Sequence, residues 1–153
     1  MTRWLSEEQQ KNWRAWLTAS TLLNDQLSRD LQETHGITIA DYEILVRLSE
    51  TPDRRLRMSE LASQTLSSRS RLSHQIDRME RAGFVERQTC ADDRRGAFAV
   101  MTDQGWTTLV AAAPDHVKSV RTHLVDQLSD EEFASLGAAC ERVAAHLNAT
   151  QPA

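Results

Sequence analysis

The spacing of apolar residues changes once along this 153-residue chain, and that change limits the folds open to it. Most of the chain has apolar residues at helical spacing. The segments 84–90 (FVERQTC) and 97–102 (AFAVMT) are instead typical of short strands. The polar stretch between them, 91–96 (ADDRRG), ends in glycine and is typical of a hairpin turn. The pattern predicts a mainly α chain with a small β-hairpin.

Helical spacing and end signals divide the rest of the chain into helices. The expected helices cover residues 7–33, 38–49, 58–64, 66–81 and 103–128, with a last helix after residue 129. Gly36 and Gly83 are placed to end two of them, and Ser59 is a candidate N-cap for the short third helix. Ser129 and Glu132 form a capping box. Helix, short helix, helix and hairpin is the order of a winged helix-turn-helix.

Charge is unevenly distributed along the chain. The formal net charge is −4, which argues against a general polyanion binder. Residues 54–95, however, carry ten arginines, no lysine and six acids, and therefore +4. The remainder carries −8. Arginine has a planar fork that suits phosphates and base edges, so this central segment is the candidate for contact with nucleic acid.

One face of the expected helix 66–81 is small, polar and mostly cationic. Leu72, Ile76 and Met79 cluster on the opposite, apolar side. A surface of serine and arginine can enter a major groove without steric hindrance. The simpler alternative is a solvated helix face. Two neighbours favour the first interpretation, namely the preceding short helix and the hairpin tip with Arg94 and Arg95, which can reach a minor groove.

Four segments together resemble the multiple antibiotic resistance regulator (MarR) family of winged-helix transcriptional regulators. They are 68–80 (SRSRLSHQIDRME), 83–87 (GFVER), 92–96 (DDRRG) and 101–105 (MTDQG). The segments 114–121 and 128–132 are similar to the helices that follow in the family, and the resemblance covers about residues 13–147. One difference is Ser73-His74, where the family often has Thr-Arg.

The resemblance implies a single domain, 1–153, with a winged helix-turn-helix lobe (36–102) and a helical dimerisation lobe (1–35 and 103–153). It implies a homodimer whose two recognition helices enter successive major grooves of a palindromic operator in double-stranded DNA. Asp93 and Arg95 would be the family's wing pair, in which the acid orients the arginine. We expect DNA contacts from Ser67, Ser68, Arg69, Ser70, Arg71, Ser73, His74, Arg78, Arg94 and Arg95. The expected function is a sequence-specific repressor released by a small ligand.

Other residue types leave alternatives open. The resemblance also implies a small aromatic effector, whose pocket Trp13, Trp16 and Tyr42 could line; alternatively, these rings fill the core of a dimer. The five histidines show no compact metal-ligand set, so we expect neither a metal nor a cofactor. Cys90 and Cys140 could form a redox switch, although unreactive thiols are the simpler interpretation.

Several classes of protein are not favoured. No apolar run approaches the length of a membrane span, and the start has no uncharged core of a secretion signal, so the expected location is the cytoplasm. No phosphate-binding glycine loop, nucleophile elbow or His-Glu-x-x-His pair is present, so we expect no enzyme. The alternatives to a DNA-binding regulator are a winged-helix protein-interaction module without DNA binding and, less favoured, a small enzyme using the aromatic N-terminal residues.

Overall fold

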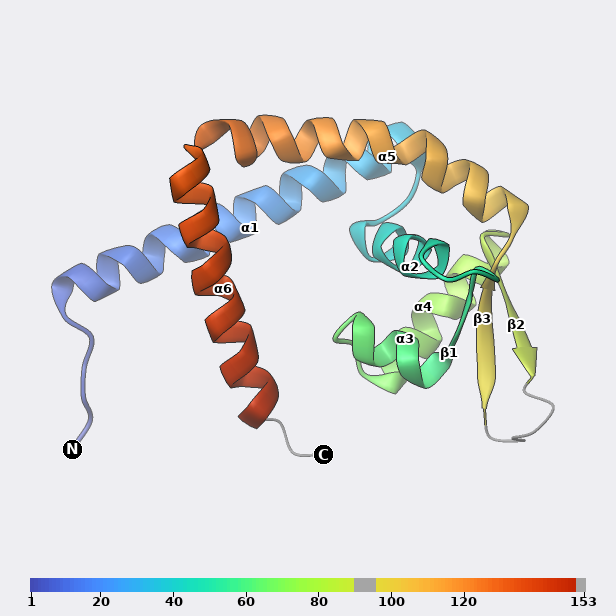
Figure 1. Ribbon diagram of the computed structural model, residues 1–153, viewed down its shortest axis with the longest axis horizontal. Coiled ribbons are helices and arrows are strands. Elements are labelled where there is room, and N and C mark those ends of the chain that lie inside the picture. The colour runs from blue at the N-terminus through green and yellow to red at the C-terminus, as the bar shows by residue number, and fades with distance from the viewer. Residues whose placement is uncertain (90–95, 151–153) are drawn as a thin grey trace. The chain divides into compact units, whose positions relative to one another are not determined.

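The computed structural model describes residues 1–89 and 96–150, and these form a helical chain with one small sheet (Figure 1). The helices are α1 (Glu7–His35), α2 (Ile39–Ser49), α3 (Met58–Gln64), α4 (Arg69–Arg81), α5 (Asp103–His123) and α6 (Asp130–Thr150). The strands are β1 (Arg55–Arg57), β2 (Val85–Thr89) and β3 (Ala97–Met101), and a short 3-10 turn, η1 (Val125–Gln127), follows α5. The predicted class, mainly α with a small antiparallel β element, is confirmed.

The chain divides into two compact units. One comprises residues 24–116, and the other comprises residues 1–23 together with 117–153. The 24–116 unit holds the sheet, α2, α3 and α4. It also includes the last two fifths of α1 and the first two thirds of α5, so it extends on both sides of the segment 36–102.

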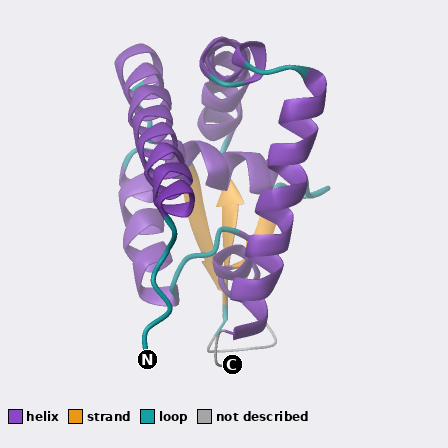
Figure 2. Ribbon diagram, turned by 90° about the vertical axis from the view of Figure 1, so that its left-hand side faces the viewer, coloured by secondary structure: helices purple, strands orange, loops and turns teal. Residues whose placement is uncertain are grey.

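The sheet has three antiparallel strands in the order β1-β3-β2 (Figure 2, orange). Strands β2 and β3 pair from Val85 with Met101 to Thr89 with Ala97, as the predicted hairpin requires. Strand β1 pairs with β3 and was not predicted. It has only three residues, Arg-Leu-Arg, and its single apolar side chain is too little for a strand pattern to be recognised.

The helix-turn-helix packs on one face of this sheet through a continuous apolar core. Leu72, Ile76 and Met79 of α4 are buried there, as their spacing predicted. They belong to one core cluster with buried side chains from α2, α3, the strands and the start of α5, including Leu45, Leu48, Leu61, Val85, Ala99 and Leu109. Because side chains from all these elements close one core, α4 is held rigidly with its polar face outward.

Helix ends show where sequence signals were sufficient and where they were not. Gly36 and Gly83 have φ of +67° and +85°, as expected of glycines that end helices. Helix α4 begins at Arg69 and not at residue 66, because Leu66 is itself in the left-handed region with φ +52° and belongs to the turn. Ser59 is not the cap of α3, since the helix already begins at Met58.

Candidate nucleic-acid interface

The outward face of α4 carries most of the residues expected to contact DNA. Ser68 caps the helix, and its hydroxyl accepts a hydrogen bond from the Arg71 backbone nitrogen at 3.1 Å. Exposed side chains then follow along the helix, while Ser67 and Ser73 are half-buried. The exposed members of the expected set are Ser68, Arg69, Ser70, Arg71, His74 and Arg78. Four of these are basic, Arg69, Arg71, His74 and Arg78, and Arg81 at the end of the same helix is exposed as well.

The turn between α3 and α4 is tight. The backbone nitrogen of Ser67 donates to the Ala62 carbonyl at 3.0 Å, and that of Thr65 donates to the Leu61 carbonyl at 3.0 Å. The left-handed conformation of Leu66 reverses the chain between these bonds, and its side chain is exposed. The two helices are thus joined by the short turn that a helix-turn-helix needs.

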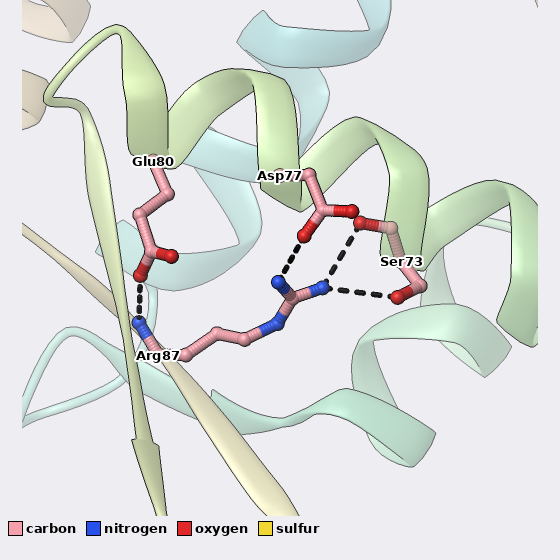
Figure 3. A network of polar contacts seen from close by, with 4 residues as sticks. All are labelled: Ser73, Asp77, Glu80 and Arg87. Atoms are coloured by element: carbon pink, nitrogen blue, oxygen red, sulfur yellow. Dashed lines mark hydrogen bonds and ion pairs between the residues drawn. The ribbon is translucent and has the colours of Figure 1, made fainter.

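Arg87 of β2 connects the hairpin to α4 (Figure 3). Its Nη1 donates to the carboxylate of Asp77, and its Nη2 donates to both the carbonyl (2.9 Å) and the hydroxyl (3.0 Å) of Ser73. Its backbone nitrogen donates to Glu80 Oε2 at 2.7 Å. The hydrogen bond from Arg87 lowers the pKa of Asp77 below its ordinary value, against the opposing effect of desolvation.

This network was missed at the level of sequence. Arg87 lies in the family-like segment GFVER but carried no assigned role, and Ser73 was expected to face DNA. In the structure the Ser73 hydroxyl accepts from Arg87 within the protein. The sequence signal for this network is the pair of Asp77 and Arg87, an acid and a base that lie ten residues apart across the turn from helix to strand.

The structure describes the base of the wing, where β2 and β3 pair, but not residues 90–95. Asp93, Arg94, Arg95 and Cys90 all lie in that undescribed part. At the base, Arg55 and Arg57 of β1 place their guanidinium carbons 4.5 and 5.3 Å from the Phe98 ring centroid. These two arginines were counted in the basic segment but not assigned to the interface.

A separate pocket of about 400 Å³ lies in the 24–116 unit, among α1, α2 and α5. Tyr42 lines it, with its ring centroid 4.4 Å from that of His116. Arg47 Nε and His116 Nδ1 are buried and have no hydrogen-bond partner among the described residues. Burial lowers the pKa of His116 and raises the pKa of Tyr42.

The remaining candidate residues lie elsewhere. Trp13 and Trp16 belong to the other unit, where they are 51% and 47% exposed. Cys140 is an exposed free thiol on α6. Among residues 1–89 and 96–150, no group of three or more histidine, cysteine or acidic side chains could hold a metal ion. None of the helices in this part of the chain has the length and apolarity to cross a membrane.

Comparison with known proteins gives this architecture its family. Residues 35–96 match a family model described as MarR family. The crystal structure of AbsC, a MarR family transcriptional regulator from Streptomyces coelicolor, is 50% identical, with a TM-score of 0.93 over 97% of this chain and 100% of that one. This chain belongs to the MarR family.

Further MarR relatives extend the comparison. Sco3205, a MarR family transcriptional regulator from Streptomyces coelicolor solved in complex with DNA, is 45% identical, with a TM-score of 0.93 over 99% of this chain and 94% of that one. The HTH-type transcriptional regulator PecS from Dickeya dadantii (strain 3937) is 26% identical over 86% of this chain and 79% of its own length. The resemblance found in the sequence is confirmed, and these MarR relatives are regulators of transcription.

Proposed function

We propose that this protein is a homodimeric transcriptional repressor that acts in the cytoplasm, binds a palindromic operator in double-stranded DNA and is released by a small ligand. The observation that carries the proposal is the exposed, cationic face of α4, held in place by a buried apolar face and by Arg87. The DNA complex of Sco3205, at 45% identity, supports the DNA-binding step.

Within α4, Arg71 and Arg78 project from the exposed face at a spacing of about two helical turns. Arginine reads guanine through two parallel hydrogen bonds, whereas serine and histidine offer single donors. We assign base reading to Arg71, His74 and Arg78, and phosphate contacts to Ser67, Ser68, Arg69 and Ser70 near the start of the helix. Arg94 and Arg95 remain the expected minor-groove residues of the wing, and Asp93 remains the acid expected to orient Arg95.

Selection of bound duplexes from a random pool tests sequence-specific binding. Recovery of a palindromic consensus supports the proposal, and Arg71→Ala should then relax preference at one position of each half-site. A uniform loss across all duplexes would demote Arg71 to a phosphate contact. Arg29→Ala, an exposed change on α1, is the matched control. Recovery of no duplex would favour the winged-helix protein-interaction module.

The proposal of a homodimer is based on apolar side chains of α6 that are exposed in the single chain. Helix α6 has no buried residue between Asp130 and Thr150, and Val143 and Leu147 are 59% and 53% exposed on it. Exposed apolar surface of this kind is typical of an interface between subunits. Sedimentation equilibrium should give twice the chain mass, and Val143→Glu should shift the population to monomer. If the wild type and the Val143→Glu variant both have the mass of a single chain, the homodimer is excluded.

The proposal of a small ligand is based on the pocket formed by α1, α2 and α5. An aromatic acid would stack on Tyr42 and offer its carboxylate to the two buried nitrogens that lack partners among the described residues, on Arg47 and His116. Titration calorimetry with salicylate as the probe tests this, with Arg47→Met as the variant that keeps the pocket's bulk. Heat of binding that Arg47→Met leaves unchanged would place the acid elsewhere.

A further inference from the structure

A second hollow, of about 500 Å³, opens between α4 and the base of the wing. It is lined mainly by basic and hydroxyl side chains from three parts of the fold: the junction of β1 and α3, the first turns of α4, and the strands where the hairpin begins. The polar and wing-base members are Arg57, Ser59, Arg69, Ser73, Arg87 and Gly96. No acidic residue lines it among the residues that the structure describes.

The three arginines in this lining differ in how far their charge is compensated. Arg87 is hydrogen-bonded to Asp77 and to Ser73, so its charge is largely neutralised and its position is fixed. Arg57 and Arg69 are exposed, and neither has an ion pair among the described residues. The nearby carboxylate of Glu60 accepts from the backbone nitrogen of Arg57 at 3.4 Å. The hollow therefore presents two uncompensated positive charges.

The place of the hollow in the fold determines which anion would reach it. A winged helix puts its recognition helix into the major groove and its wing into the neighbouring minor groove. One sugar-phosphate strand separates these two grooves. That strand has to pass between the recognition helix and the wing, where Arg57 and Arg69 lie.

We infer that this hollow binds a phosphodiester group of the DNA backbone. Arg57 and Arg69 supply the charge, Ser59 supplies a neutral hydroxyl donor, and Arg87 acts as a positioning residue that holds the wall formed by Ser73. The inference rests on the proposed DNA-binding function and deepens it. Arg57 and Ser59 were not among the residues expected to contact DNA. Because phosphate contacts carry no base information, these residues set register and affinity but not sequence preference.

Salt dependence gives the first test. Each phosphate contact adds about 0.9 to the slope of log K against log salt, which is roughly 3.5-fold in affinity between 50 and 200 mM salt. Fluorescence anisotropy with the selected operator should show that Arg57→Ala and Arg69→Ala each flatten the slope, and that the two changes together flatten it by about this amount per subunit, equally on an unrelated duplex. Arg57→Lys and Arg69→Lys should restore most of the slope, and Arg29→Ala should leave it unchanged.

A neutral backbone gives the second test and distinguishes a DNA phosphate from a free anion. Single methylphosphonate linkages are moved along the operator, and one linkage per half-site should weaken the wild type about as much as the double change Arg57→Ala with Arg69→Ala does. The same linkage should not weaken that double variant further. Inorganic phosphate should compete with DNA no better than chloride at equal ionic strength. Stronger competition that Arg57→Ala and Arg69→Ala abolish would assign the hollow to a free anion and overturn the inference.

The two levels of the proposal fail differently. If the wild type binds the operator but both alanine variants, judged folded by their melting temperatures, keep its affinity and slope, then the phosphodiester site is wrong and the DNA-binding function stands. If the wild type binds no duplex while remaining folded, the proposed function itself falls, and the phosphodiester site falls with it.

Discussion

The guanidinium of Arg87 on β2 is hydrogen-bonded to the carboxylate of Asp77 on α4. Through the same fork Arg87 also reaches the Ser73 carbonyl and hydroxyl, one helical turn earlier. A single side chain therefore fixes two turns of the recognition helix against the strand that leads into the wing. The relative placement of the two elements that we propose contact DNA depends on it.

Arg87→Lys should weaken operator binding nearly as much as Arg87→Ala does, by about tenfold. A lysine ammonium is a point charge on a flexible stem and cannot reproduce the planar fork that reaches Asp77 and Ser73 together. Circular dichroism should show an intact helical fold with a melting temperature a few degrees lower. Operator affinity by anisotropy is the readout, and a fully active Arg87→Lys would contradict the positioning role.

Gly105→Ala should destabilise the 24–116 unit strongly. A Cβ at this position would overlap the Phe84 carbonyl oxygen and lie 2.9 Å from Met101 Cγ. Both lie in the rigid region where β2 and β3 meet α5, so the clash has to displace backbone. Helix propensity alone predicts the opposite effect, because alanine is favoured over glycine within helices by about 1 kcal/mol and would make the variant more stable. Urea unfolding decides between the two effects, and a more stable variant would exclude the clash.

Ser68 allows capping to be separated from contact with DNA. Its hydroxyl accepts from the Arg71 backbone nitrogen at 3.1 Å, so Ser68→Ala should cost about 1 kcal/mol of unfolding free energy. Ser68→Asp keeps a capping oxygen and should keep the stability, but its negative charge should repel the phosphates and reduce operator affinity. Thermal melts and anisotropy on both variants provide the check. Full operator affinity in the Ser68→Asp variant would remove Ser68 from the interface.

The recognition helix and its buried face were predictable because their signals are local. Leu72, Ile76 and Met79 repeat with helical spacing, and Gly83 ends the helix where a left-handed residue is needed. The order of elements along the chain then indicated the winged helix-turn-helix. Family membership followed from the same short segments.

The features that were missed depend on contacts between distant parts of the chain. Strand β1 exists because Leu56 pairs with Ala99 and packs into the core, more than forty residues away in sequence. The sequence predicts that this helix begins at residue 66, three residues before its observed start at Arg69, because a leucine side chain gives no indication of the left-handed backbone at Leu66. The bond from Gln75 Nε2 to Asp41 Oδ1, which joins α4 to the start of α2, likewise had no sequence signal.

The pocket near α2 should make stability depend on pH through His116. Burial lowers the pKa of His116 in the folded protein below its ordinary value near 6.5, so the unfolded chain binds the proton more readily. The free energy of unfolding should therefore be highest above about pH 7 and fall as the pH drops through about 6.5 toward the lowered folded value. Urea unfolding at about pH 7.5, 6.5 and 5.5 measures this loss.

His116→Phe keeps an aromatic ring against Tyr42 but removes the imidazole. The contribution of His116 to the pH dependence of the unfolding free energy is then the difference between the wild type and this variant. That difference matters because His35, paired with Asp115 at 2.9 Å, is also a titratable group nearby. His146→Gln, on the exposed surface of α6, is the matched control and should titrate like the wild type. If His116→Phe loses as much stability across this pH range as the wild type does, the buried imidazole is not the group that responds. If the loss disappears, the imidazole that lines the pocket between α1, α2 and α5 sets the stability of the fold near neutral pH.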